Sequence, residues 1–464
     1  MKRWLTPLLL CPGLAQAAGL DASAFSPLWA LPFVGMLLSI ALGPLLATRF
    51  WHHHFGKVAA FWAACFLVPL ALTQGLGVMA GAVLHTLVAE YIPFTVLLVA
   101  LFAASGGIFI RGNLHGSPGL NTGLMALGAL LASLMGTTGA SMLLIRPLIR
   151  ANDNRRHVVH VVVFFIFIVS NAGGSLTPLG DPPLFLGFLQ GVDFFWTVTH
   201  IGPETLLVVG SLLLIFYAID RHWYRKEGVL PADPTPDTPG FGIEGAINFL
   251  PLALVVGLVL LSGLWKPGVV LDVAGTPLAL QSLVRDVGLI GVTLLSLALT
   301  PKGVREKNQF SWAPMAEVAK LFSGIFLTMV PVLAMLQAGL NGPFAGLVRW
   351  VSSPEGQPVP MAYFWLSGWL SAFLDNAPTY LVFFNLAGGD AQALMGIGAT
   401  TLAAVSAGSV FMGAMSYIGN APNFMVKAIA EDRGIRMPSF FGYMAWSLGI
   451  LLPVLALMSW VFFR

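Results

Sequence analysis

Four polar segments interrupt an otherwise apolar sequence, and they hold the side chains best suited to bind an ion. Short hydroxyl, amide and carboxylate groups can replace the water that a solute sheds when it crosses a bilayer. Glycine and proline in the same segments prevent a continuous helix and free backbone groups for the same purpose. The segments are Ser133–Ser141 (SLMGTTGAS), Ser170–Pro183 (SNAGGSLTPLGDPP), Ser371–Tyr380 (SAFLDNAPTY) and Ser416–Asn423 (SYIGNAPN).

Two carboxylates lie within these segments, Asp181 and Asp375. Ionisable groups at membrane depth are costly and usually mark ion sites or proton relays. The structural alternatives are that Asp375 caps a helix and that Asp181, just before two prolines, forms a tight turn. We expect the cargo to contact Thr137, Thr138, Ser170, Asn171, Thr177, Asp181, Asp375, Asn376, Thr379, Asn420 and Asn423, with Asp375, Asn376, Asn171 and Asn420 as candidate Na⁺ ligands.

Other reactive side chains lie outside these segments. Lys427 follows the fourth segment and could counter a carboxylate or an anionic substrate; the alternative is that it snorkels to the interface, as we expect for Lys320. The tract His52–His54 is interpreted as a solvated interfacial loop rather than a metal site. Cys11 and Cys65 are too few for a disulfide framework or a metal centre, and no cofactor is predicted beyond a coupling ion, Na⁺ or H⁺.

Composition excludes most soluble classes. Of the 464 residues, 57% are hydrophobic and only 9% charged, against about a quarter charged in soluble domains. The basic residues are scattered along the loops without interleaved aromatic residues, so nucleic-acid binding has no support. We therefore expect the chain to be embedded in membrane lipid. Apolar spans are predicted near 31–48, 58–80, 93–110, 201–219, 246–264, 283–300, 316–338 and 438–462.

The layout predicts an all-α polytopic membrane protein with two inverted repeats, each of about five transmembrane helices plus one re-entrant hairpin. Interrupted helices would lie at the site. Lys2, Arg3, an apolar run and Ala15-Gln16-Ala17 are typical of a cleavable signal peptide, with an uncleaved interfacial segment as the alternative. The predicted parts are a signal at 1–18, a first repeat at 19–226 (hairpin 120–149, broken helix 158–190), a cytoplasmic linker at 227–245, and a second repeat at 246–464 (hairpin 359–388, broken helix 392–432).

Charge placement supports this layout. With a periplasmic N-terminus, fifteen basic residues fall on the cytoplasmic side of an inner membrane and four on the periplasmic side. A single crossing by segment 120–149 would break this bias, whereas a hairpin that enters and leaves on one side preserves it. The cytoplasmic set is Arg49, Lys57, Arg111, Arg146, Arg150, Arg155, Arg156, Arg221, Arg225, Lys226, Lys302, Arg305, Lys307, Arg433 and Arg436; the periplasmic set is Lys266, Arg285, Arg349 and Arg464.

The polar segments resemble those of the ion transporter superfamily, which includes NhaD-type sodium/proton antiporters, arsenite permeases and citrate or dicarboxylate carriers. Asn171–Gly174 with Thr177-Pro178 and Gly180-Asp181 looks like the NhaD-type broken-helix motif. The stretch from Ser371 to Pro378 looks like the second hairpin tip. The resemblance implies a homodimer with scaffold and mobile transport regions and sodium or proton coupling at the hairpin tips and breaks.

The chain also departs from these patterns. Thr137-Thr138 replaces the Ser-Asn-Thr signature that dicarboxylate carriers have at both tips, and Pro182-Pro183 follows Asp181 where the NhaD type usually has threonines. This variant resembles proteins described either as sodium/proton antiporters or as citrate transporter-like. The resemblance therefore leaves the substrate open.

Three hypotheses follow. The favoured one is cation/proton antiport, in which Asp181 and Asp375 bind Na⁺ and H⁺ competitively. The second is uptake of citrate or a similar organic anion coupled to Na⁺ or H⁺, with hydroxyls and helix N-termini holding the carboxylates. A membrane enzyme is disfavoured, because the His, Cys and carboxylate positions do not cluster in the sequence.

Overall fold

The computed structural model describes residues 25–235, 242–273 and 275–464, and the chain is a mostly helical, multi-pass membrane protein. Ten helices in this part of the chain are long and apolar enough to cross a membrane. Positions 1–18, predicted as a signal, lie outside the described residues. The ten are Pro27–Pro44, Arg49–Gln74, Leu76–Ser105, Pro118–Met135, Val159–Leu176, Trp196–Glu227, Ala246–Leu264, Leu280–Leu299, Ala313–Gln337 and Phe440–Phe462.

The first half of the chain contains three long helical spans, a helix pair, an interrupted helix and a long final helix. A π-helical turn, η3, joins α4 to α5 without ending the helix. The elements are η2 (Pro27–Ala30), α2 (Leu31–Leu46), α3 (Thr48–Gln74), α4 (Leu76–Thr86), η3 (Leu87–Tyr91), α5 (Ile92–Ser105), β1 (Phe109–Arg111), α6 (Pro118–Met135), α7 (Thr137–Ala151), α8 (Val159–Ile168), η4 (Ala172–Leu176), α9 (Pro182–Leu189) and α10 (Trp196–Glu227).

The second half follows the same order of long spans, helix pair, interrupted helix and final helix. Its elements are β2 (Gly242–Glu244), η5 (Ala246–Asn248), α11 (Phe249–Leu264), β3 (Val270–Val273), β4 (Thr276–Ala279), α12 (Leu280–Leu299), α13 (Lys302–Lys307), α14 (Ala313–Gln337), η6 (Gly339–Asn341), α15 (Ala345–Trp350), α16 (Pro360–Phe373), α17 (Asn376–Leu386), α18 (Ala391–Met395), α19 (Ala399–Phe411), η7 (Met412–Met415), α20 (Ala421–Asp432), α21 (Phe440–Trp446), η8 (Ser447–Leu451) and α22 (Leu452–Phe462).

Helices that hold the same place in the two halves pack reciprocally. α2 packs against α3, and α11 packs against α12. α3 packs on α14 of the other half, while α5 packs on α12. In the same reciprocal way, α17 packs on α9 of the first half and α7 packs on α20 of the second half. The halves therefore interlock rather than lie side by side, and both contribute to the centre.

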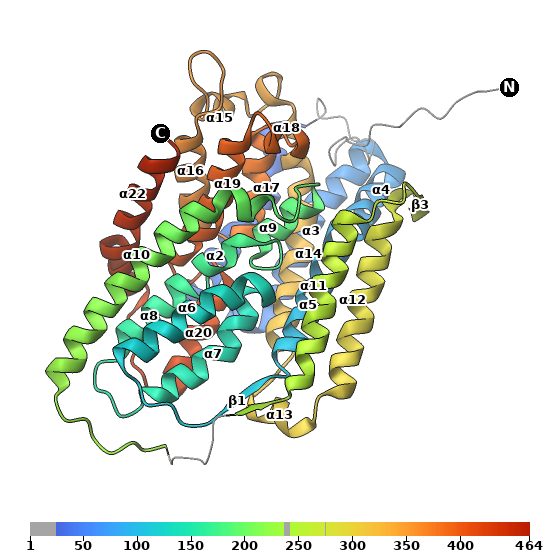
Figure 1. Ribbon diagram of the computed structural model, residues 1–464. Helices are drawn as coiled ribbons and strands as arrows, with labels where there is room; N and C mark the ends of the chain where they lie inside the picture. The colour runs from blue at the N-terminus through green and yellow to red at the C-terminus, as the bar shows by residue number, and fades with distance from the viewer. Residues whose placement is uncertain (1–24, 236–241, 274) are drawn as a thin grey trace.

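Two antiparallel helix pairs approach that centre from opposite ends of the molecule (Figure 1). The pair α6–α7 turns at Gly136, whose φ of 81° suits a residue without a side chain. The pair α16–α17 turns at Leu374 and Asp375. Proline at the first helical position and, for α6, the Ser117 hydroxyl at the N-cap define the outer ends of these pairs.

The two interrupted helices end in the interior. α8 stops at Ile168 and its continuation is the short turn η4, followed by α9 after Pro178 and Asp181. α19 passes into η7 and resumes as α20 after Asn420. The glycine and proline residues of both breaks leave backbone groups free at the middle of the protein. The window Val159–Leu176 is 89% buried, so this break is surrounded by protein rather than lipid.

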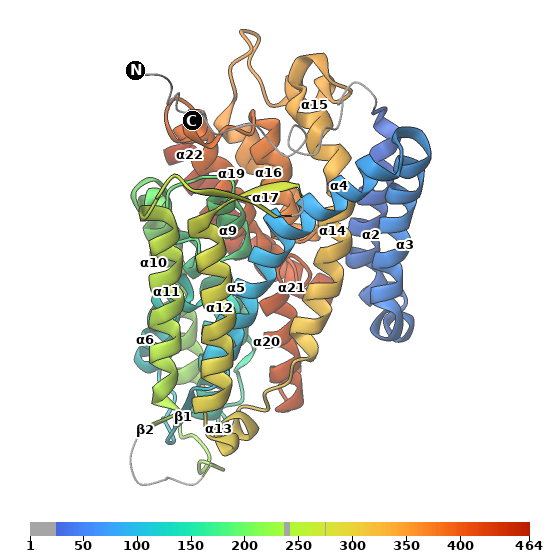
Figure 2. The same cartoon turned by 90° about the vertical axis from the view of Figure 1, so that its right-hand side faces the viewer.

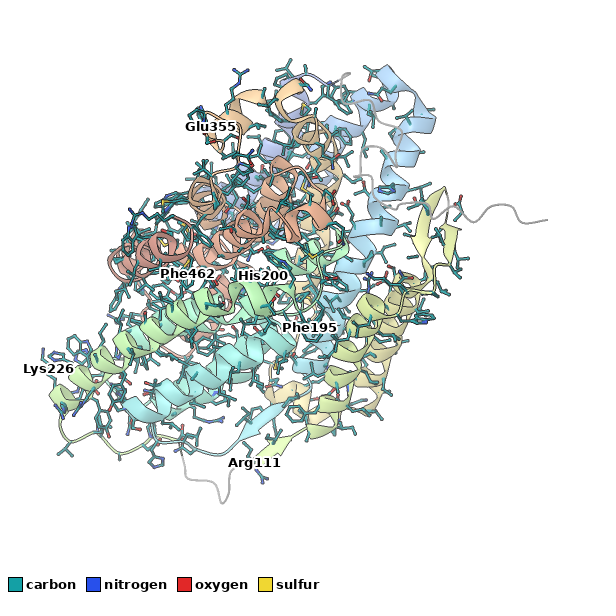
Figure 3. All side chains as sticks on the ribbon, turned by 45° about the horizontal axis from the view of Figure 1, so that its top comes forward. Arg111, Phe195, His200, Lys226, Glu355 and Phe462 are labelled. Carbon is teal, nitrogen blue, oxygen red and sulfur yellow. The ribbon has the colours of Figure 1, made fainter. Side chains whose placement is uncertain are left out.

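Two groups of helices make up the molecule (Figures 1 and 2). The helix pairs, the interrupted helices, α10 and α22 form one group, which we call the core group. α2 to α5, α11, α12 and α14 form the other, which we call the frame group. Figure 3 labels Phe195 and His200 at the start of α10 and Lys226 near its opposite end, which shows that this helix runs the length of the core group.

Some predicted boundaries were wrong. His52–His54 lie within α3, which begins at Thr48, and not in a loop. The predicted spans 58–80 and 93–110 are replaced by Arg49–Gln74 and Leu76–Ser105, because helical hydrogen bonding continues through residues too polar for the hydrocarbon core. The predicted linker contains β2, which pairs antiparallel with β1 and ties the two halves together at one end of the molecule.

Candidate ion-binding site

The N-termini of four short helices converge on one internal cavity. α7, α9, α17 and α20 begin at Thr137, Pro182, Asn376 and Ala421, and all four of these residues line the cavity. Its volume is about 80 Å³, room for one or two waters or an ion with a few ligands. Two of these helices follow hairpin turns and two follow helix breaks, so every polar segment of the sequence contributes.

Asp181 is the more extensively hydrogen-bonded of the two carboxylates at the cavity. It is 1% exposed and receives hydrogen bonds from three side chains. Thr137 Oγ1 donates to Asp181 Oδ1 at 2.9 Å, and Asn420 Nδ2 donates to the same oxygen at 3.1 Å. Asn376 Nδ2 donates to Oδ2. Three donors on one buried carboxyl group satisfy an ionised carboxylate without a basic partner.

Three asparagines continue this network behind Asp181. Asn420 Nδ2 also donates to Asn171 Oδ1 at 3.2 Å, and Asn171 Nδ2 donates to Asn423 Oδ1 at 2.7 Å. Asn423 Nδ2 in turn donates to the carbonyls of Gly413 and Ser416 in the second break. The chain of amides therefore connects the two helix breaks through their side chains.

Asp375 lies at the same cavity in a different role. Its side chain accepts a hydrogen bond from the backbone N–H of Ala377 at 3.1 Å and caps α17. The structural alternative raised for this residue is thus present in the geometry. Because Asp375 is only partly buried and lines the cavity, capping does not prevent its carboxylate from contacting an ion.

Asn376 has a buried acceptor without a partner among the described residues. Its Nδ2 is bonded to Asp181, but its Oδ1 has no hydrogen-bond donor within the described part of the chain. Buried amide oxygens are nearly always satisfied, so an unpaired one at a polar cavity points to a missing donor or cation. A cation held by carboxylate and amide oxygens would satisfy it.

The remaining predicted side chains fall into two sets. Thr138 lines the cavity. The others are bonded within the protein: Ser170 to Ser141, Thr177 to the Ser133 carbonyl, and Thr379 to the Asp375 carbonyl. These three hydroxyls fix the breaks and the hairpin tip and do not line the cavity.

Sequence reasoning missed the apolar walls of the cavity. Phe102, Phe185, Met315, Phe322 and Met425 line it together with the polar residues. Nothing in the sequence distinguishes them from the other apolar residues of long membrane helices. Gly136, in contrast, was within a polar segment, and its position at the turn gives the cavity a wall without a side chain.

No basic side chain lines the cavity within the described residues. Lys427, considered as a counter-charge, pairs with Glu431 at 2.7 Å instead. Lys320 lies over the Phe55 ring, away from the site. A helix N-terminus carries about half a positive charge, so four of them offset about two negative charges. The helix ends can therefore stabilise Asp181 and Asp375 where no lysine or arginine does.

Comparison with known proteins identifies the family. The profile of the putative citrate transport family matches residues 22–463. The chain belongs to this family. No curated protein matches the sequence. Membership covers nearly the whole chain and agrees with the helical, multi-pass architecture and with the resemblance to the ion transporter superfamily. The family and the membrane-spanning helices support a secondary transporter.

Proposed function

We propose that this protein is a cation/proton antiporter in which Na⁺ and H⁺ compete for the carboxylates of Asp181 and Asp375. In this proposal the amide oxygens of Asn376 and Asn420 complete the ligand set, and Asn171, predicted as a third ligand, does not line the cavity but accepts a hydrogen bond from Asn420. A group that holds either a proton or a cation, but not both, couples the movement of one to the other. The coupling needs no covalent chemistry and no nucleotide.

The observation that carries the proposal is the chemistry of the cavity wall. Two carboxylates and Asn376, whose buried Oδ1 has no partner among the described residues, line a space of about 80 Å³ that no basic side chain lines in the described part of the chain. Oxygen ligands without a basic partner favour a hard cation over an anion. The volume is also below the roughly 300–1,000 Å³ typical of pockets for small organic molecules.

Uptake of citrate or a similar organic anion, coupled to Na⁺ or H⁺, is the second candidate. It is favoured by the description of the family and by the four helix N-termini, which attract carboxylates. In that case Thr137 and Thr138 would face the anion, and Asp375 would hold the coupling ion. The cavity would have to widen before a tricarboxylate could enter.

Proteoliposomes with a pH gradient and a pH-sensitive dye separate the two candidates. Addition of Na⁺, Li⁺ or K⁺ alone should collapse the gradient for the wild-type protein. Asp181→Asn and Asp375→Asn should reduce this response to background. Asp390→Asn is the matched control, since Asp390 is an exposed cap of α18 that does not line the cavity, and Asn can replace it as a cap.

Two results of this assay would argue against cation/proton antiport. A full cation response in Asp181→Asn and Asp375→Asn would contradict the proposal. Collapse of the gradient by citrate but not by a cation alone would favour the second candidate and make Asp375 a ligand of the coupling ion.

A further inference from the structure

A second, larger cavity lies between the core group and the frame group. Its volume is about 820 Å³, and it is bounded by the start of α10, the end of α9, and the β3–β4 ends of α11 and α12. Its polar lining comes mainly from one stretch of α12. The polar residues that line it are Asp193, Thr199, Ser262, Lys266, Gln281, Ser282, Arg285 and Asp286.

The charged and amide side chains that line this cavity are most stable in contact with water. Arg285 is 3% exposed and pairs with Asp286 at 2.7 Å, within a helix that is long and apolar enough to cross the membrane. Gln281 lies one turn earlier on the same face, and its Oε1 is buried without a partner among the described residues. Charged and amide groups in the first turns of a membrane-spanning helix are stable when they line a water-filled space. This lining suits an aqueous chamber better than a packing defect.

A single turn of α9 separates this chamber from the ion-binding site. Phe185 lines the small central cavity, and Phe188, three residues later, lines the chamber. The two rings stack with their centroids 6.0 Å apart. Asp181 lies at the N-cap of the same helix. One turn of an α-helix rises about 5.4 Å, so the residues that line the two cavities are separated by less than one turn of α9.

Arg285 holds this wall from the opposite group of helices. Its guanidinium lies over the Phe185 ring, 5.8 Å from the centroid, while its Nε donates to Asp286 Oδ1 at 2.7 Å. Arg285 belongs to α12 of the frame group, and Phe185 belongs to α9, which packs on α17 of the core group. The cation–π contact therefore crosses the boundary between the two groups.

We infer that the 820 Å³ chamber is the aqueous entrance to the ion-binding site, closed by Phe185 and Phe188, with Arg285 as the residue that positions Phe185. A hydrated ion or small carboxylate would wait in the chamber and pass when the contact between Arg285 and Phe185 opens. The inference does not depend on which cargo the proposed function assigns to the site.

Thiol labelling tests the entrance without any transport assay. In a background with Cys11 and Cys65 replaced by Ala, a membrane-impermeant cationic methanethiosulfonate reagent is applied to the side on which Asp272→Cys, in the β3–β4 hairpin, is labelled. Gln281→Cys should react from that side within about tenfold of the Asp272→Cys rate. Leu289→Cys, on the same helix but fully buried, should not react.

The gate is tested with a partly buried reporter in the central cavity, Thr138→Cys. Phe185→Ala should accelerate reporter labelling from the β3–β4 side at least tenfold, and Phe185→Leu by less. Arg285→Gln should also accelerate it, whereas Arg285→Lys, which retains the cation over the ring, should restore the slow rate. Phe164→Ala, a fully buried ring that lines neither cavity, is the matched control and should leave the rate unchanged.

Two results would overturn the inference. If Gln281→Cys is as unreactive as Leu289→Cys, the chamber is not open to water. If Phe185→Ala and Phe164→Ala give the same reporter rate, the phenylalanine pair is not the barrier. Both results are independent of whether Na⁺ or citrate is transported.

Discussion

Asp375 and Asn376, neighbours at the second hairpin tip, have different roles. Asp375 caps α17 through the N–H of Ala377, while Asn376 reaches across to Asp181 in the other half of the chain. A carboxylate at a helix N-terminus is stabilised by the helix ends it caps. The tip thus places a negative charge at the cavity at little electrostatic cost.

Capping and charge at Asp375 can be separated by substitution. Asp375→Asn retains a good capping side chain, so the free energy of unfolding should change by only a few tenths of a kcal/mol. Asp375→Ala removes the cap and should lower that free energy by about 1 kcal/mol. Both should abolish coupled transport. Thermal unfolding in detergent compares the stability of Asp375→Asn with that of Asp375→Ala. Equal losses of stability in the two variants would show that the cap contributes nothing.

The identity of these residues could be predicted from sequence, but their partners could not. Asp181 and Asp375 are conspicuous because carboxylates are rare in apolar segments. The three donors to Asp181 come from Thr137, Asn376 and Asn420, which are 44, 195 and 239 residues away in the chain. Only the interlocked packing of the two halves decides that they meet, and no local pattern encodes it.

The helix breaks depend on close backbone contacts between paired glycines. A Cβ at Gly180 would lie 2.0 Å from the carbonyl oxygen of Gly174, and one at Gly419 would lie 2.5 Å from that of Gly413. Both contacts are with backbone, which cannot rotate away as a side chain can. Each break is therefore a compact loop that only glycine permits.

Gly180→Ala should distort the first break and move Asp181. We expect transport to fall to background and the free energy of unfolding to drop by about 1–3 kcal/mol, as for an overpacked core. Gly210→Ala in α10 is the control, since a Cβ there meets nothing within 4 Å and should be tolerated. Wild-type transport by Gly180→Ala would show that the break can relax around a methyl group.

A buried polar cluster fixes the outer end of the first helix pair. Asp220 of α10 accepts hydrogen bonds from Arg155 Nη1 at 2.7 Å and Asn121 Nδ2 at 2.9 Å, and His160 Nε2 lies 2.9 Å away. Asn121 also exchanges two amide hydrogen bonds with Asn152 at the end of α7. The cluster joins α6, the end of α7, α8 and α10.

Asp220→Asn would leave the buried Arg155 without its closest counter-charge. Glu227, 3.1 Å from Arg155 Nε, remains as a second counter-charge, so the cost should be smaller than the roughly 3–5 kcal/mol of a fully broken buried pair, and the unfolding temperature in detergent should still fall. Glu431→Gln breaks an exposed pair with Lys427 and should cost less than about 1 kcal/mol. Similar unfolding temperatures for the two variants would mean that the buried cluster does not stabilise the helix pair.

Sequence patterns predicted the helix pairs and breaks better than the helix ends. Glycine, proline and polar residues mark where an apolar helix must stop, and those positions are local. The ends of α3 and α10 were missed because Arg49, His52–His54 and the basic residues before Glu227 remain helical beyond the apolar stretch. Hydropathy detects the membrane boundary, whereas hydrogen bonding decides the end of the helix.

The core group and the frame group meet through an apolar cluster beside the central cavity. Phe102 of α5 and Met315 of α14 pack there with Met142 of α7, and Met425 of α20 packs against them. Methionine adapts readily to changed surroundings, which suits a surface where two groups of helices slide past one another. The resemblance to the ion transporter superfamily implies such movement between scaffold and transport regions.

A covalent link between the groups should stop transport if they move. Met315→Cys with Met425→Cys, joined by a short thiol cross-linker, should lose transport on cross-linking and recover it on reduction. Leu258→Cys with Gly288→Cys links α11 to α12 inside the frame group, where a Cβ at Gly288 already lies 2.7 Å from Leu258, and should remain active. Transport by the cross-linked Met315–Met425 pair would exclude relative motion of these helices.

The two breaks are built alike yet carry different charges. Thr177 and Ser416 each donate to a backbone carbonyl of the preceding helix pair, and the paired glycines follow the same spacing. The residue after the second glycine is Asp181 in the first break and Asn420 in the second. The two side chains are almost identical in size. Two matched loops with a carboxylate in one alone are unequal in charge, because a proton or a cation can neutralise Asp181 but has no counterpart at Asn420. The replacement of one oxygen by an amide nitrogen thus decides which of the two loops can hold a charge.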